Sequence, residues 1–223
     1  MEERFSRNIP AISPEAQEKL RNSHVCIAGC GGLGGYLIEF LARAGVGRFT
    51  VIDADRFEPS NLNRQCLSTL ETLDTVKSDA AAKRIAAIDP SIHIRTEQTF
   101  LDAANAENLL QGADLVMDAL DSAASRLVLT DACRKLRIPL IHGAIGGWNA
   151  QISVCMPEDS GLAELYQRNA VSEDKSCLSF TPALCAALQC AEAVKLLTGT
   201  EPALKSRLLL ADLRYMDFVT IDL

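Results

Sequence analysis

The sequence predicts an α/β fold in which helices cover both faces of a mostly parallel sheet, with antiparallel strands added at its C-terminal end. Short apolar runs alternate with helix-like segments from residue 24 to residue 144. The first apolar run ends in a cluster of glycines that opens a helix. Three further β-rich runs come late in the chain. Alternating strands and helices favour a parallel sheet that binds ligands at the carboxyl ends of its strands.

The elements follow from local patterns of apolar residues and from turn residues. In the alternating part, we expect strands at 24–29, 48–55, 92–100, 114–120 and 139–144, and helices at 33–44, 77–88, 103–110 and 123–137. Later strands are expected at 151–156, 207–213 and 218–223. A helix at 182–197 has proline in its first turn and Gly199 just past its end. The segment before residue 24 is treated as a polar start with no element assigned.

Length and composition favour one globular unit spanning residues 1–223. The chain is 48% hydrophobic, enough to form a full core. The polar stretch at 157–176 predicts a crossover loop at about 157–181, which we expect to be mobile.

Charge and cysteine usage exclude several classes of protein. A net charge of −7 argues against nucleic acid as the main partner. No apolar stretch is long and uninterrupted enough for a membrane span, and the N-terminus is unlike a signal peptide, so we expect a cytoplasmic protein without a membrane partner. The eight cysteines include no CxxC pair, which favours reduced thiols and no structural zinc.

A glycine turn predicts a nucleotide site. Gly29, Gly31 and Gly34 fit the G-x-G-x-x-G pattern between a strand and a helix, where backbone N–H groups can approach a phosphate. Asp53 ends the next strand, where a carboxylate can bind ribose hydroxyls. Together these features indicate a Rossmann-like nucleotide fold; the alternative is a glycine turn that only packs helix against strand.

The charged residues that follow favour nucleotidyl transfer over nicotinamide redox chemistry. They comprise Asp55, the string Ser60-Asn61-Leu62-Asn63-Arg64-Gln65, Lys77, and Asp118 and Asp121 of the run MDALD. Cations that take up developing charge and a carboxylate that holds a metal suit a triphosphate with Mg²⁺.

A helical turn over 61–64 would put Asn61 and Arg64 on one face, where both can point at the terminal phosphates. Arg64 supplies a forked, permanent cation, and Lys77 a point charge. The alternative is that Arg64, Lys77 and Asp121 are ordinary surface charges.

These motifs resemble the ThiF/MoeB/HesA family of ubiquitin-activating-enzyme-like adenylyltransferases. The matching pieces are the glycine turn 29–34, Ala44-Gly45-Val46-Gly47, Val51-Ile52-Asp53-Ala54-Asp55, the string 60–65, Lys77 and the segment 118–121. Weaker similarity runs from about residue 4 to residue 197.

The resemblance implies a role for each matching residue. The nucleotide site would comprise Gly29, Gly31, Gly32, Gly34, Asp53, Asp55, Ser60, Asn61, Arg64, Lys77 and Ser122. Within it, Gly32 lies against the nucleotide, and Asp53 holds the ribose. Asn61 and Arg64 bind the β and γ phosphates, Lys77 binds the α phosphate, and Asp121 holds Mg²⁺.

The resemblance also implies a reaction and its partners. The C-terminal glycine carboxylate of a small ubiquitin-like sulfur carrier ending in Gly-Gly would attack the α phosphate of ATP, giving an acyl-adenylate and pyrophosphate. Arg7 matches the arginine that a dimer partner lends in this family, so a homodimer with Arg7 acting in trans is expected, and Arg7 joins Arg64, Lys77 and Asp121 as a catalytic candidate.

The sequence departs from the family in two places. Members with a zinc site carry two CxxC pairs, whereas the corresponding stretch here reads Gly161-Leu162-Ala163-Glu164-Leu165-Tyr166, so no zinc is expected. Ser122 replaces an asparagine common in relatives, which we expect to change contacts on the adenine side modestly.

Cys177 lies near the place where some relatives carry a cysteine that bonds covalently to the carrier. A thiol in a mobile polar loop can capture an acyl-adenylate or a persulfide. We favour the alternative, a small residue leading into a helix, because nothing nearby in the sequence clearly lowers its pKa.

Three other functions stay open at this point: activation of a tRNA base or small carboxylate, a nicotinamide-dependent oxidoreductase, and a non-catalytic partner subunit. The acidic charge disfavours the tRNA version, the string at 60–65 disfavours the oxidoreductase, and the complete set of phosphate-site charges disfavours the non-catalytic subunit.

Overall fold

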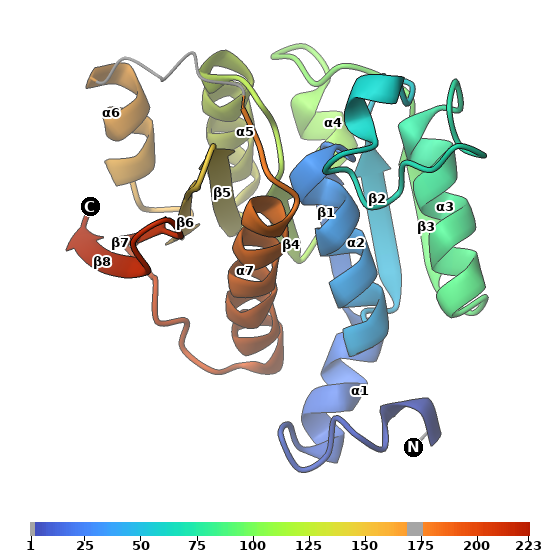
Figure 1. Ribbon diagram of the computed structural model, residues 1–223. Helices are drawn as coiled ribbons and strands as arrows, with labels where there is room; N and C mark the ends of the chain where they lie inside the picture. Colours follow the sequence, from blue (N-terminus) through green and yellow to red (C-terminus); the bar gives the residue numbers. More distant parts are fainter. Residues whose placement is uncertain (1–2, 169–175) are drawn as a thin grey trace.

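The computed structural model describes residues 3–168 and 176–223. Its strands form one eight-stranded sheet in the order β3-β2-β1-β4-β5-β6-β7-β8 (Figure 1). The first five strands in this order pair in parallel, and the last three are added antiparallel. The predicted fold class is therefore confirmed.

The parallel strands are short and mostly buried. They are β1 (His24–Ala28), β2 (Arg48–Ile52), β3 (His93–Glu97), β4 (Leu115–Asp118) and β5 (Leu140–Gly146). All four residues of β4 are buried, as expected for a central strand covered by helices on both faces. The antiparallel extension consists of β6 (Asn149–Cys155), β7 (Arg207–Asp212) and β8 (Asp217–Asp222).

Helices lie on both faces of the sheet and bury two separate cores (Figure 1). On one face are α2 (Gly32–Ala44), α3 (Lys77–Ile88) and α7 (Phe180–Thr198), with α1 (Pro14–Asn22) packed against α7. On the other are α4 (Ala106–Leu110), α5 (Ala123–Leu136) and α6 (Gly161–Arg168). Two short 3-10 helices, η1 (Glu3–Phe5) and η2 (Pro59–Asn61), complete the described elements.

The helix α7 is long and apolar enough to cross a membrane by length and composition alone. Its contacts explain this composition, because it packs against α2 and against β5 and β6. Cys185 and Ala193 of this helix are fully buried. Its hydropathy is that of a helix in the protein core.

Two helices were missed by the sequence analysis. The polar start contains α1, in which Ser13 caps the helix by accepting a hydrogen bond from the Ala16 N–H, and Pro14 occupies the first turn. The expected loop at 157–176 was wrong in its first part, which forms α6. This helix is held by Leu162, which is 3% exposed in the second core. Residues 169–175 of the expected loop lie outside the described residues.

Candidate active site

The glycine turn and the segment after β4 meet at the carboxyl end of the sheet. From β1 the chain continues to β2, which pairs with one edge of β1. The strand β4 pairs with the opposite edge of β1, so the strand order reverses between β1 and β4. Ligands of open α/β sheets bind at such a reversal. The Ala119 N–H donates to the Ala28 carbonyl at 2.9 Å, which ties the two segments together.

Three glycines of the turn differ in the space that surrounds a side chain at their position. Gly29 has a φ of 99°, and a Cβ there would lie 2.6 Å from the Ala119 carbonyl oxygen. At Gly34 a Cβ would lie 1.9 Å from the Gly29 carbonyl oxygen, so this glycine lets α2 pack against the turn. A Cβ at Gly32 would meet only the Arg64 and Pro182 side chains, at 3.8 and 3.9 Å. Gly32 therefore leaves room beside the first turn of α2, where N–H groups lack partners within the helix.

The carboxylate of Asp53 is held by two backbone N–H groups, one of which belongs to the glycine turn. Its Oδ2 accepts from the Cys30 N–H at 2.7 Å, and its Oδ1 accepts from the Asp55 N–H at 2.8 Å. Burial raises the pKa of Asp53 and outweighs these two hydrogen bonds, which lower it. Asp53, the residue predicted to bind the ribose, therefore lies directly against the glycine turn. It lies just outside β2, which ends at Ile52.

Lys77 is buried at the start of α3, with 7% of its surface exposed. Its side-chain Nζ lies 3.0 Å from Oδ2 of the exposed Asp55, and its backbone N–H donates to the Asp55 carbonyl at 2.9 Å. The ammonium also interacts electrostatically with the Asp53 carboxylate. A buried cation is therefore held by the segment that follows β2.

The predicted helical turn over 61–64 is present, since the Arg64 N–H donates to the Asn61 carbonyl at 3.2 Å. The Asn61 side chain, however, is buried and accepts from the Glu58 N–H at 3.0 Å, which stabilises its own loop. Arg64 lies over Gly32, and its Nη1 donates to the Ser60 carbonyl at 2.8 Å and to Asn63 Oδ1 at 2.9 Å. Of the two, Arg64 is the one presented beside the turn.

Asp121 and Ser122 follow β4 on the other side of the turn. Asp121 is exposed, two residues beyond Ala119, which contacts Gly29. Ser122 is the N-cap of α5 and accepts from the Ser125 N–H at 3.1 Å. One exposed carboxylate suits Mg²⁺, which is typically held by one or two carboxylates together with substrate phosphates.

Arg7 is not near the turn within the same chain. Its neighbour Asn8 donates to the Ala44 carbonyl at the last residue of α2. This 13-residue helix separates the N-terminal segment from Gly32 by about 20 Å. Arg7 can therefore serve this site only from another copy of the chain.

Cys177 lies beside the Arg64 segment, with its carbonyl accepting from Asn63 Nδ2 at 3.2 Å. Burial raises the pKa of the Cys177 thiol, and the Arg64 guanidinium offsets this only in part. The Cys177 thiol therefore interacts with the Arg64 charge, but its pKa stays above the ordinary value. In the described part of the chain no three His, Cys, Asp or Glu side chains are grouped to hold a metal ion. The absence of a zinc site remains an expectation.

Asp118, which the sequence analysis counted among the charges of the nucleotide site, is instead buried in a polar group that the sequence did not predict. Asp118, His142 and Arg126 are 1%, 0% and 6% exposed, and their side chains contact one another. The sequence signals were an aspartate closing an apolar strand and a histidine inside the apolar run 139–144. Neither signal shows that the two residues meet, because β4 and β5 become neighbours only in the sheet.

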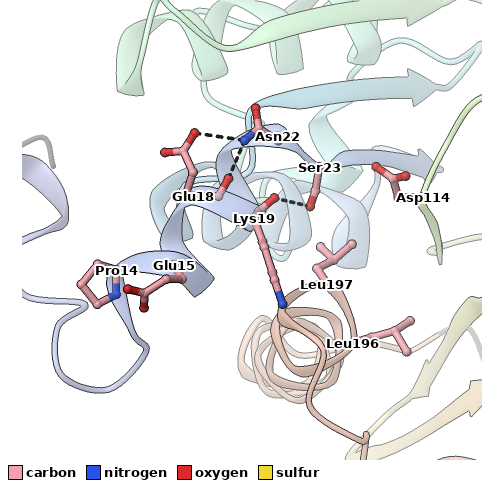
Figure 2. Close-up of a pocket in the computed structure, with 9 residues that line it drawn as sticks. All are labelled: Pro14, Glu15, Glu18, Lys19, Asn22, Ser23, Asp114, Leu196 and Leu197. Carbon is pink, nitrogen blue, oxygen red and sulfur yellow. Dashed lines mark hydrogen bonds between the residues drawn. The ribbon is translucent and has the colours of Figure 1, made fainter.

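One pocket in the described structure lies away from the glycine turn. Its volume is about 770 Å³, and it lies between α1 and the end of α7, beside Ser23 and Asp114 (Figure 2). These two residues precede β1 and β4, at the amino ends of the strands. Lys19, its cation, donates to the Thr198 carbonyl at 2.9 Å. The residues predicted to bind a nucleotide lie at the opposite, carboxyl end of the strands.

The fold and the turn define a Rossmann-type nucleotide-binding protein. Comparison with known proteins specifies it further, because the ThiF family matches residues 5–223. The SAMP-activating enzyme E1 of Haloferax volcanii is 34% identical over 227 residues, covering 98% of this chain and 84% of that protein. The sulfur carrier protein adenylyltransferase of Thermus thermophilus is 35% identical over 216 residues, covering 92% and 80%. The chain therefore belongs to the ThiF family and is an adenylyltransferase of that family.

A solved structure agrees with the fold. The crystal structure of E. coli MccB with ATP superposes with a TM-score of 0.85, covering 100% of this chain and 72% of that one. At 20% sequence identity it shows a shared fold and nothing finer.

Proposed function

We propose that this chain uses ATP to adenylate the C-terminal glycine carboxylate of a small ubiquitin-like sulfur-carrier protein. The observation that carries the proposal is that three predicted groups border one glycine turn. Arg64 lies over Gly32, Lys77 interacts electrostatically with Asp53, whose Oδ2 accepts from the Cys30 N–H of the turn, and Asp121 follows the segment packed on Gly29. The names of the two relatives, which refer to SAMP activation and to a sulfur carrier, support the choice of substrate.

The residues present fit a Mg²⁺-bound triphosphate. Gly32 leaves space beside the first turn of α2, Arg64 lies over it, and the buried Lys77 supplies a second positive charge, which interacts with Asp53. Asp121 would hold the metal, with phosphate oxygens completing its coordination. When bound, Mg²⁺ neutralises charge on the phosphate oxygens.

The chemistry asks for positioning and charge neutralisation. A carboxylate oxygen of the carrier forms a bond to the α phosphorus as the bond from that phosphorus to the bridging oxygen breaks, and the electron pair leaves with pyrophosphate. Lys77 would stabilise charge on the α phosphate, and Arg64 charge on the leaving group. No proton is transferred in this step, so no general base is needed.

Exchange of labelled pyrophosphate into ATP tests the proposal. We expect exchange when the protein is mixed with Mg²⁺ and a ubiquitin-like carrier ending in Gly-Gly, and loss of exchange when the carrier lacks its last glycine. Arg64→Ala, Lys77→Ala and Asp121→Ala should each lower the rate at least about 100-fold. Lys83→Ala, an exposed lysine on the same helix as Lys77, is the matched control and should retain the wild-type rate.

Two results would count against this function. Near-wild-type exchange in all three variants would refute the site. Exchange driven by a small carboxylate and not by any Gly-Gly carrier would keep the adenylation and replace the substrate.

A further inference from the structure

The buried polar group behind Asp121 forms a continuous chain of side chains. We call it the Asp118 cluster, and its members are Asp118 of β4, Arg126 of α5, His142 of β5, Gln151 of β6 and Tyr166 of α6. Asp118 lies at the end of its strand, three residues before Asp121. The cluster thus joins five elements of the sheet and of one helical layer directly behind the candidate metal ligand.

Two members clamp the peptide groups that lead to Asp121. The Leu120 N–H donates to Asp118 Oδ1 at 3.0 Å, and Arg126 Nη2 donates to the Leu120 carbonyl at 2.5 Å. The residue immediately before Asp121 is therefore bonded through both of its backbone polar groups. Arg126 Nε also lies 3.4 Å from Asp118 Oδ2, so an ion pair ties the two clamping side chains together.

His142 holds the second oxygen of Asp118. Its Nδ1 lies 2.7 Å from Asp118 Oδ2. Burial lowers the pKa of His142; the hydrogen bond and the charge of Asp118 raise it but only partly offset burial, and Arg126 lowers it by a smaller amount. A neutral ring that donates from Nδ1 leaves Nε2 as an acceptor.

Tyr166 and Gln151 complete the chain on the side of α6. The Tyr166 hydroxyl lies 3.2 Å from His142 Nε2 and accepts from Gln151 Nε2 at 2.9 Å, so each side chain donates to the next as far as Asp118. The Arg126 guanidinium lies over the Tyr166 ring, 5.5 Å from its centre. This direction of donation fixes the orientation of Asp118.

Stability alone is a poor reason for such a cluster. Replacing a buried ion pair by apolar side chains of similar volume is often neutral or stabilising. A hydrogen-bonded polar network instead specifies one geometry, and in this one only Arg126 Nε, among the side-chain atoms of the five members, is buried without a hydrogen-bond partner in the described structure. Here the geometry that it specifies is that of the peptide carrying Asp121.

We propose that the Asp118 cluster is a positioning device, in which His142 and Arg126 orient the Asp118 carboxylate so that the Leu120 peptide, and with it Asp121, is held ready for the metal of the nucleotide complex. The inference rests on the proposed function. None of the five residues touches the reacting atoms, and their effect is transmitted through Leu120.

Binding of Mn²⁺ in the presence of the non-hydrolysable nucleotide AMPCPP, followed by electron paramagnetic resonance, tests this role. We expect His142→Leu to weaken Mn²⁺ binding about tenfold while AMPCPP binding without metal is unchanged. In His142→Asn the side-chain amide occupies the position of Nδ1 and should restore Mn²⁺ affinity to within about threefold of wild type. Leu109→Ala, a buried residue of α4 that is not a member of the cluster, controls for lost stability and should leave Mn²⁺ affinity unchanged.

The outcomes separate the two proposals. A wild-type protein that binds neither AMPCPP nor Mn²⁺ with it refutes the proposed function. A wild-type protein that binds both, with His142→Leu equal to it or with Leu109→Ala weakened to the same degree, refutes the positioning role alone. If His142→Leu does not fold, Tyr166→Phe removes only the hydroxyl that faces Nε2; an approximately threefold loss of Mn²⁺ affinity supports the role, and wild-type affinity refutes it.

Discussion

At the scale of the residue, the glycine turn combines two kinds of glycine. Gly34 is required by the fold, because its Cα faces the Gly29 carbonyl with no space for a side chain. Gly32 has no such neighbour. A Cβ at this position would lie at ordinary van der Waals distance from the nearest atoms, which belong to the side chains of Arg64 and Pro182. The pattern G-x-G-x-x-G therefore contains two positions that packing requires, Gly29 and Gly34, while we propose that the neighbouring Gly32 lies against the ligand.

Alanine substitutions separate these two roles. Gly34→Ala should destabilise the protein by about 1–3 kcal/mol or more, because backbone atoms must move apart. Gly32→Ala should keep the melting temperature, since alanine favours helix over glycine by up to about 1 kcal/mol, and should weaken ATP binding about tenfold. Calorimetric unfolding and ATP titration measure the two effects. Equal ATP affinity in Gly32→Ala and wild type would remove this residue from the site.

Some residues of the candidate site can be predicted from the sequence, and others depend on the fold. Asp53 and Arg64 are predicted because they stand in the recognisable strings 51–55 and 60–65, and Lys77 is predicted as a lone cation that follows them. His142 was assigned only as a strand residue, because its partner Asp118 lies 24 positions away and meets it through strand pairing. The inward use of the Asn61 side chain likewise depends on the fold of its loop.

At the scale of the element, long helices with clear start and stop signals were predicted well, and α3 agrees at both ends. The misses were short polar helices. The sequence of α6 looks like a loop because of the polar residues around it, yet Leu162 and Leu165 at helical spacing contact the second core. Tertiary contacts stabilise such a helix, and its own sequence predicts it weakly.

The helix α6 should depend on Leu162. Leu162→Ala removes a buried side chain and should cost about 2–4 kcal/mol, with faster hydrogen exchange throughout α6. Gln167→Ala, an exposed position on the same helix, is the control and should leave the exchange unchanged. Unaltered exchange in Leu162→Ala would show that α6 is held by other contacts.

The end of α3 is joined to α1 by a buried carboxylate. Asp89 Oδ2 lies 2.9 Å from Arg21 of α1, and its Oδ1 accepts from the Ser91 N–H and hydroxyl. Burial by itself raises the pKa of Asp89, but the hydrogen bonds from Ser91 and Arg21 outweigh it and hold the pKa well below its ordinary value.

This lowered pKa has a consequence for stability. The ionised group stabilises the fold above the unfolded-state pKa of about 3.9, and this contribution is lost as the pH falls toward the lower folded-state pKa. Asp89→Asn should therefore cost about 2 kcal/mol at neutral pH, with the difference from wild type shrinking below about pH 4. Urea unfolding across this range measures it. A difference that is constant down to about pH 2 would contradict the assignment.

At the scale of the whole molecule, we propose that a second copy of the chain contributes Arg7 to the active site. The N-terminal segment lies at the far end of α2 from the glycine turn (Figure 1). If Arg7 acts in trans, Arg7→Ala and Asp121→Ala proteins should each be inactive alone. Mixed and allowed to exchange subunits, they should regain about a quarter of wild-type activity, because half of the dimers are mixed and each has one intact site. No recovery on mixing, in spite of exchange, would exclude the role in trans.

The central claim is that Arg64, Lys77 and Asp121, which are far apart in the sequence, act on one triphosphate over the glycine turn. A crystal structure with ATP and Mg²⁺ tests it most directly. We predict the triphosphate beside Gly32, with Arg64 and Lys77 in contact with phosphate oxygens and the metal next to Asp121. A nucleotide bound away from Gly32, or these three side chains turned away from its phosphates, would contradict the claim.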